Sequence, residues 1–277
     1  MTDATDQRET PPDGLLPVEQ TDVLSMRISN LDFAGVCAQV SARIASGEPG
    51  YIVTPNVDHV CRYHKDAAFR AAYDNAFLVL ADGMPLLWAA ALFGNPLRKK
   101  LSGSDLLPLL SAYAAERGYS IYLLGAAPGV ADEAARTLQQ ANPGLRVAGA
   151  YSPPLRFEDD PATLQDVLKR LRDAAPDICF LALGSPRQEI WLHRHHRESG
   201  ARVLLGVGAA LDFAAGRVRR APVWMQRSGL EWTWRVMQEP MRLGRRYFVD
   251  DSYFVTLLAR EALRRLGLCR APTTPAR

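Results

Sequence analysis

Four short polar clusters interrupt apolar stretches of the chain, and they carry the carboxylate, amide and hydroxyl groups that hold or activate polar substrates. The clusters occupy residues 54–58, 81–83, 184–189 and 206–212. The first begins with Thr54, and the second holds Asp82 directly after an apolar run. In the third, Pro186 can start a helix, which places Gln188 and Glu189 in its first turn. These side chains are the first candidates for binding or catalysis.

Each cluster also has a purely structural interpretation. Asp82-Gly83 is a common turn pair. Asn56 and Asp58 are suitable helix caps, and Glu189 can simply complement a helix dipole. The structural interpretation is the simpler one for any single cluster. The clusters share a position at the ends of predicted strands, however, and that favours a functional site for the set.

The elements that must position these clusters alternate between short apolar runs and helical patterns. We predict strands over residues 51–54, 77–81, 120–124, 145–149, 178–183 and 203–207. We predict helices over residues 31–45, 67–75, 86–92, 105–117, 130–141, 161–174 and 187–198. The regular alternation from residue 120 onward predicts a parallel sheet with helices on both faces. The expected fold class is α/β, a mostly parallel Rossmann-like sheet with an Arg-rich helical appendage at its C-terminal side.

Glycines gather at the ends of the predicted strands, where ligands bind in such sheets. They are Gly125, Gly184, Gly206 and Gly208. Glycine permits close backbone approach, and a helix that starts after it aims N–H groups at a phosphate. Glycine also simply ends strands, but several such sites favour a nucleotide-type ligand. Neither a G-x-G-x-x-G nor a Walker A sequence occurs, which argues against a standard NAD enzyme and a P-loop NTPase.

The net charge of +3 hides an uneven distribution along the 277 residues. Residues 217–277 hold thirteen Arg and five acidic residues, a balance of +8, and the remaining chain holds twenty basic and twenty-five acidic residues, a balance of −5. Arg suits bidentate phosphate binding, although codon bias alone could also explain the excess of Arg.

We predict a disordered leader over 1–22, a catalytic α/β domain over 23–216, a helical appendage over 217–270 and a frayed tail over 271–277.

The predicted appendage has the composition of a surface that meets lipid head groups. Its Arg residues are interleaved with Trp, Tyr and Met, and three of the five Trp lie in it. A predicted helix over 252–266 is amphipathic, a pattern more often used for core packing than for membranes.

No apolar run approaches the roughly 20 residues of a membrane span, and no signal peptide is expected. The four cysteines are isolated, which favours a reducing compartment and no zinc site.

The motifs together resemble the WecG/TagA/CpsF family of bacterial glycosyltransferases, from about Thr54 to Arg246. The segments that carry the resemblance are T-P-N-V-D (54–58), A-D-G-M-P (81–85), L-S-G-S-D-L (101–106), L-G-A-A-P-G (124–129), P-D-I-C-F-L-A-L-G-S-P-R-Q-E (176–189), G-V-G-A-A-L-D-F-A-A-G (206–216), R-A-P (220–222), G-L-E-W-T-W-R (229–235) and E-P-M-R-L-G-R-R-Y (239–247). The resemblance implies an inverting, metal-independent enzyme that moves a sugar from a UDP-sugar to a polyprenyl-diphosphate-linked sugar during cell-surface polysaccharide synthesis.

The resemblance also implies roles for individual residues. Asp82 of the A-D-G motif would be the general base. The expected substrate-binding residues are Thr54, Asn56, Lys100, Gln188, Glu189, Gly125, Gly184, Gly208 and Asp212. The expected acceptor-diphosphate-binding residues are Arg235, Arg242, Arg245 and Arg246. Many members have Arg where this chain has Lys100, so the charge is kept but the bidentate geometry is not.

The expected partners are a UDP-sugar donor, a polyprenyl-diphosphate-linked acceptor and the inner face of the plasma membrane, with a homo-oligomer as a further possibility. We expect no cofactor, no metal and no nucleic acid, and a cytoplasmic protein peripherally attached to the membrane. One alternative is a non-catalytic nucleotide- or polyanion-binding protein that uses the Arg-rich tail. Another is a nucleotide-sugar epimerase or dehydrogenase, which the missing dinucleotide motif disfavours.

Overall fold

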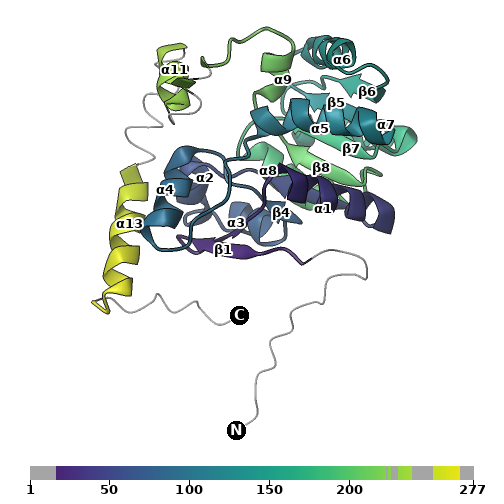
Figure 1. Cartoon of the computed structure of the whole chain (residues 1–277). Coiled ribbons are helices and arrows are strands. Elements are labelled where there is room, and N and C mark those ends of the chain that lie inside the picture. Colours follow the sequence, from purple (N-terminus) through teal and green to yellow (C-terminus); the bar gives the residue numbers. More distant parts are fainter. Residues whose placement is uncertain (1–16, 223, 226–229, 239–251, 269–277) are drawn as a thin grey trace.

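A six-stranded, all-parallel sheet forms the centre of the protein, with the strand order β4-β3-β8-β7-β5-β6 (Figure 1). The computed structural model describes residues 17–222, 224–225, 230–238 and 252–268. The strands are β3 (Gly50–Val53), β4 (Leu78–Val79), β5 (Ser120–Gly125), β6 (Arg146–Tyr151), β7 (Ile178–Ala182) and β8 (Val203–Gly206). All six have bounds within two residues of the predicted ones, so the predicted parallel sheet is confirmed.

Successive strand residues point to opposite faces and build two separate apolar cores. On β7, for example, Cys179 and Leu181 belong to one core, whereas Ile178 and Phe180 belong to the other. One face is covered by α1 (Phe33–Ser46), α5 (Gly103–Arg117), α6 (Val130–Ala141) and α9 (Ala210–Ala214). The other is covered by α2 (Val57–Tyr63), α3 (Ala67–Asp74), α4 (Met84–Leu92), α7 (Pro161–Ala174) and α8 (Arg187–His195). The predicted arrangement of helices on both faces is therefore confirmed.

Local capping chemistry explains where several helices begin. Helices α6 and α7 have the predicted bounds, and Asp160 caps α7 by accepting from Thr163 N. Helix α5 begins at Gly103, two residues before the predicted start, because Ser102 and Asp105 form a capping box. Helix α8 begins at Arg187 directly after Pro186, as predicted.

An antiparallel hairpin precedes the sheet and was not predicted. Its strands are β1 (Gln20–Val23) and β2 (Met26–Ser29), so the predicted leader over 1–22 extends too far by residues 20–22. The physical reason is burial, since Thr21 and Val23 point into the protein. Ser29 Oγ accepts a hydrogen bond from Val79 N at 3.2 Å, so the hairpin satisfies an amide of edge strand β4.

The described part of the C-terminal segment is helical, as expected. Helix α13 (Ser252–Arg265) packs against α2 through Phe254 and Leu257, and Figure 1 shows it beside α2 and α4. Helix α11 (Glu231–Gln238) lies between α9 and α13 in the chain. None of the helices in the described ranges is both long and apolar enough to cross a bilayer.

Candidate active site at the strand ends

The four polar clusters meet at one edge of the sheet, where the strand order reverses. The chain runs outward from β3 to β4 on one side and from β5 to β6 on the other, and β8 and β7 later fill the centre. Ligands bind beyond the carboxyl ends of strands at such a switch point. The clusters follow β4, β3, β8 and β7, which are consecutive neighbours in the sheet. The predicted position of the clusters at the strand ends is thus confirmed.

Asp82 is held by backbone contacts from two directions. Its N–H donates to the carbonyl of Pro55 at 2.8 Å, and the carbonyl of the preceding Ala81 accepts from Leu101 N at 2.8 Å. The next residue, Gly83, has φ +117°, a conformation that other residues adopt only with strain. The A-D-G sequence therefore places a half-buried carboxylate between the β3 loop and the segment that leads to α5.

Thr54 and Asn56 follow β3, beside Asp82. Thr54 is buried. Asn56 is the N-cap of α2, and its Oδ1 accepts from His59 N at 3.2 Å. The capping interpretation of Asn56 is correct, whereas Asp58 is a first-turn residue of α2 rather than the cap. The role of Thr54 and Asn56 in substrate binding stays a prediction.

Gln188 and Glu189 lie in the first turn of α8 and are both buried. Gln188 Oε1 accepts from Gly208 N at 3.1 Å, and Gln188 Nε2 donates to Glu189 Oε1 at 2.8 Å. Burial raises the pKa of Glu189 to about 7, although the Gln188 amide favours the charged form. This pair therefore links the end of β7 to the turn after β8.

Tyr73 on α3 is a buried residue near the site that the sequence analysis did not single out. Its hydroxyl pairs with His59 Nδ1 at 2.7 Å. Burial raises the pKa of Tyr73 well above its ordinary value, and the charges of Glu189, Asp82 and Asp58 raise it further. Three carboxyl groups from different segments therefore act on this phenol through their charge. Tyr73 follows Phe69 by four residues in the same helix, which is the spacing of ordinary core residues. The sequence pattern therefore does not mark Tyr73 as a functional residue.

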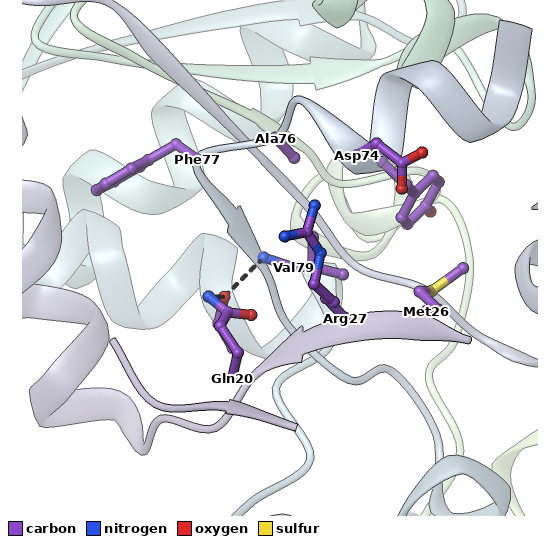
Figure 2. Close-up of a pocket in the computed structure, with 9 residues that line it drawn as sticks. Gln20, Met26, Arg27, Asp74, Ala76, Phe77 and Val79 are labelled. Atoms are coloured by element: carbon purple, nitrogen blue, oxygen red, sulfur yellow. Dashed lines mark hydrogen bonds between the residues drawn. The ribbon is translucent and has the colours of Figure 1, made fainter. Parts of the chain in front are cut away.

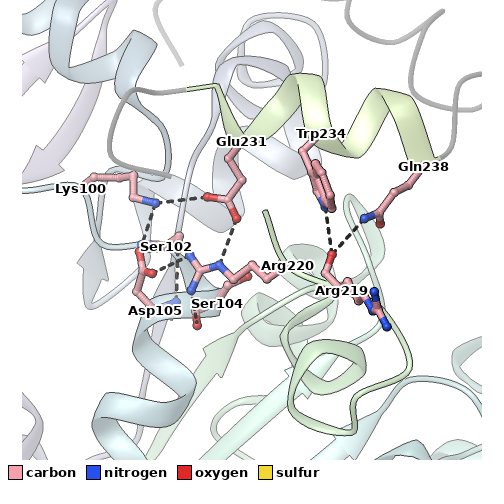
Figure 3. A network of polar contacts seen from close by, with 9 residues as sticks. All are labelled: Lys100, Ser102, Ser104, Asp105, Arg219, Arg220, Glu231, Trp234 and Gln238. Carbon is pink, nitrogen blue, oxygen red and sulfur yellow. Dashed lines mark hydrogen bonds and ion pairs between the residues drawn. The ribbon is translucent and has the colours of Figure 1, made fainter. Parts of the chain in front are cut away.

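Lys100 belongs to a partly buried network of four charged side chains (Figure 3). Lys100 Nζ lies 3.2 Å from Asp105 and 3.5 Å from Glu231 of α11. Arg220 contacts the same two acids, at 2.6 Å and 3.1 Å respectively. Burial opposes ionisation of Asp105, but the Ser102 hydroxyl, Lys100 and Arg220 together hold its pKa below the ordinary value. Lys100, predicted to bind substrate, is thus neutralised within the protein.

Helix α11 is fixed further by two bonds to one backbone oxygen. Trp234 Nε1 and Gln238 Nε2 donate to the carbonyl of Arg219 at 3.1 Å and 3.0 Å (Figure 3). Because Arg219 precedes Arg220, the helix and the network involve the same short segment. The appendage therefore begins next to the residues that flank Asp82.

The remaining predicted residues fall into three groups. Gly125, Gly184 and Gly208 all have positive φ values at strand ends. Asp212 lies in the first turn of α9, and its carbonyl accepts from Arg217 N. Arg235 lies in α11, but its side chain is outside the described structure, and Arg242, Arg245 and Arg246 lie outside the described residues. Among the described residues, no three His, Cys, Asp or Glu side chains are grouped to hold a metal ion.

A separate pocket lies between the hairpin and the α3–β4 connection (Figure 2). Gln20, Arg27, Asp74 and Phe77 line it. Its residues belong to none of the four polar clusters and come from the outer edge of the sheet, where β4 is the last strand. The candidate site is therefore the convergence of clusters at the switch point rather than this pocket.

The open parallel sheet, with acids, amides and glycines at its switch point, defines a Rossmann-like α/β protein. The chain belongs to the glycosyl transferase WecG/TagA/CpsF family, whose sequence model matches residues 21–267.

Two relatives have the same descriptive name. An N-acetylglucosaminyldiphosphoundecaprenol N-acetyl-beta-D-mannosaminyltransferase of Bacillus spizizenii is 26% identical over 245 residues, covering 88% of this chain and 91% of the relative. A protein of that name from Staphylococcus aureus strain MW2 is 27% identical over 228 residues, covering 82% and 87%. The family identified from the motifs is therefore confirmed.

Proposed function

We propose that this protein is an inverting glycosyltransferase that moves a hexose or N-acetylhexosamine-type sugar from a UDP-sugar to a polyprenyl-diphosphate-linked sugar. The observation that carries the proposal is the convergence of the four family motifs at the ends of β4, β3, β8 and β7. The relatives' name, which specifies an N-acetylglucosaminyl-diphosphoundecaprenol acceptor and an N-acetylmannosaminyl group, supports the acceptor class. The same name makes N-acetylmannosamine the first donor sugar to test.

The chemistry in this proposal is a single in-line displacement. A hydroxyl of the acceptor sugar attacks the anomeric carbon of the donor, and the bond from that carbon to the UDP oxygen breaks. UDP leaves with the bonding electron pair, and the hydroxyl proton passes to the Asp82 carboxylate. General-base assistance of this kind contributes about 10²–10⁴-fold in rate. The configuration at the anomeric carbon is inverted because attack and departure occur on opposite faces.

The leaving diphosphate gains negative charge, which backbone amides at the strand ends and cationic side chains would stabilise. Among the described residues, Lys100 and Arg220 are cations whose partners adjoin the Asp82 segment. Both already contact Asp105 and Glu231, so a diphosphate would have to compete with those carboxylates. In the proposal no metal is needed, and the sequence contains no D-x-D motif of the metal-dependent type.

A transfer assay tests this function directly. The full chain is incubated with a panel of UDP-sugars that includes UDP-N-acetylmannosamine, and with a short-chain polyprenyl diphosphate carrying N-acetylglucosamine. We expect a product one sugar heavier by mass spectrometry, formed in the presence of EDTA. Asp82→Asn should lower the rate by about 10²–10⁴-fold while UDP still raises the unfolding temperature.

A matched substitution controls for the loss of one carboxylate. Asp173 on α7 pairs with Lys169 on the exposed surface, so Asp173→Asn should retain wild-type activity. Full activity of Asp82→Asn would remove Asp82 as the base. Absence of any product, together with salt-sensitive binding to random duplex DNA, would favour the polyanion-binding alternative.

A further inference from the structure

Gln188 and Glu189 form a buried hydrogen-bond chain that ends on the turn after β8. Glu189 accepts from the Gln188 amide, and Gln188 accepts from Gly208 N. Glu189 is 1% exposed and Gln188 is 5% exposed. A Cβ atom on Gly206 would lie 3.1 Å from Gln188 Nε2, so the amide packs closely against this glycine. The two side chains therefore hold the 206–208 turn from inside the protein.

The chain of bonds fixes which way the Gln188 amide points. Its oxygen must face the Gly208 N–H, and its NH₂ group must face an acceptor. Glu189 supplies that acceptor at 2.8 Å. A flipped amide would place two donors against each other at Gly208 and two acceptors against each other at Glu189. The acid therefore reinforces the amide orientation that the Gly208 N–H also favours.

Keeping a carboxyl group at this position is energetically unfavourable. Glu189 Oε2 is buried, and taking a carboxylate out of water is unfavourable unless hydrogen bonds replace its hydration. The surroundings add negative charge, since Asp58 of α2 raises the pKa of Glu189 further. Ser185, before α8, and the Gln188 amide act in the opposite direction. An apolar residue would pack there at lower cost, so the acid has a role beyond packing.

We propose that Glu189 is a positioning residue for the transfer reaction, which acts through Gln188 to hold the 206–208 turn in the geometry that the site requires. This inference rests on the proposed function. It assigns neither Gln188 nor Glu189 to direct substrate contact, in contrast to the role expected from the sequence. The turn that they hold lies at the end of β8, next to the Asp82 side of the sheet.

Four variants of the full chain test the catalytic consequence. Glu189→Met and Gln188→Met each break the chain of bonds, and each should lower kcat by about 10- to 100-fold through misplacement of the site, with KM for the donor changed far less. Glu189→Gln can still accept from Gln188 and should recover most of the loss. The double Gln188→Met/Glu189→Met variant should be no slower than the slower single variant, because both break one chain. Independent, multiplicative losses would overturn the proposal.

Hydrogen exchange of the Gly208 amide tests the same hydrogen-bond chain without a measurement of activity. Exchange should be about 10-fold faster in Gln188→Met and Glu189→Met, equivalent to a loss of about 1.4 kcal/mol of protection, but not in Glu189→Gln. The amide of Ala126, which donates to Ala182 at a neighbouring strand end, should be unaffected and serves as the internal control.

The two measurements separate this inference from the proposed function. Unchanged Gly208 exchange in Glu189→Met would overturn the positioning role even if the enzyme is active. If the exchange of the Gly208 amide changes but the protein transfers no sugar, the proposed function is refuted. The hydrogen-bond chain through Gln188 and Glu189 would then have no catalytic role. Glu189→Gln and Gln188→Met preserve the volume of the buried site, so they keep the exchange test available if Glu189→Met folds poorly.

Discussion

Arg220 and Glu231 are joined at 3.1 Å, and this contact ties the segment after α9 to helix α11. The same guanidinium reaches Asp105 at 2.6 Å, and the same carboxylate lies 3.5 Å from Lys100. All four side chains are partly buried, so solvent screens these contacts less than it screens surface pairs. The network therefore docks the beginning of the appendage against the N-terminal end of α5.

Arg220→Met should release α11 from the body. The substitution leaves Asp105 and Glu231 close together with only Lys100 between them, and breaking a partly buried pair should cost about 1–3 kcal/mol. Hydrogen exchange in residues 231–238 should become faster, and the rest of the sheet should exchange as before. Arg217→Met is the matched control, because Arg217 pairs with Glu133 on the exposed surface and such pairs contribute little to stability. Equal exchange of α11 in both variants would contradict the docking role.

Glu189→Gln should stabilise the protein above pH 7. The pKa of Glu189 is about 7 in the folded state against 4.5 for the ordinary group. Below pH 4.5 both states are protonated and the carboxyl group imposes no charge penalty. Between pH 4.5 and 7 the unfolded state releases the proton first, so stability falls as the pH rises, by up to about 3 kcal/mol. Urea unfolding at pH 4.5, 6 and 8 measures this, and the advantage of the variant should grow and then level off.

A second glutamate provides a control of opposite sign. Glu158 pairs with Arg187, whose hydrogen bonds lower the Glu158 pKa. Its stabilising contribution is present above the unfolded pKa and is lost as the pH falls through the folded value. Glu158→Gln should therefore destabilise the protein at pH 8 and have less effect at acidic pH. An identical pH dependence for both variants would show that burial does not control Glu189.

Gly83→Ala should misplace Asp82. Gly83 has φ +117°, and an alanine there would be strained by about 1–2 kcal/mol or would shift the backbone. We expect a fall in transfer rate of about 10- to 100-fold, because the adjacent carboxylate moves. Gly118→Ala is the control, since Gly118 has φ +70° at the other end of α5 and has open space around its Cβ position. Gly118→Ala should lose similar stability but keep its activity.

Local patterns were sufficient to predict the sheet and most helices. Helices α6 and α7 follow strong amphipathic patterns with clear starts, and β7 is apolar on both faces as a central strand must be. The β1–β2 hairpin was missed because its strands have only four residues each and follow a polar, Pro-containing stretch. Helix α2 was not among the predicted helices, although its N-cap Asn56 was one of the two capping candidates.

The contacts within the candidate site could not be derived from spacing along the chain. The strand ends predicted which clusters meet, but not that Gln188 reaches Gly208 or that the charges of three carboxyl groups act on Tyr73. The charge of the tail is a second example, since its formal value of +8 does not show which arginines pair with acids in the folded protein. Arg217 and Arg220 pair with acids of the body, and Arg264 and Arg265 pair with Glu261. Only tertiary structure shows which charges remain for a ligand.

The outer face of α13 provides the sharpest test of the proposed membrane contact. Phe254 and Leu257 pack against the body, whereas Val255 of the helix is 66% exposed and Leu266, directly after the helix, is 71% exposed, with Arg260 also exposed. Exposed apolar side chains beside arginines suit an anionic lipid surface. Replacing both exposed residues, V255D with L266D, removes two apolar contacts worth roughly 1.5 kcal/mol or more each.

The expected result is a loss of binding to phosphatidylglycerol vesicles of at least about 10-fold, measured by sedimentation. Leu155→Asp is the control, because Leu155 is 84% exposed but lies between β6 and α7, away from the appendage. It introduces one negative charge, against two in the double variant, at an equally exposed apolar position, so its binding should equal that of the wild type. Unchanged binding of the double variant would show that α13 is not the membrane contact. A similar loss in Leu155→Asp would mean that added negative charge alone explains the effect.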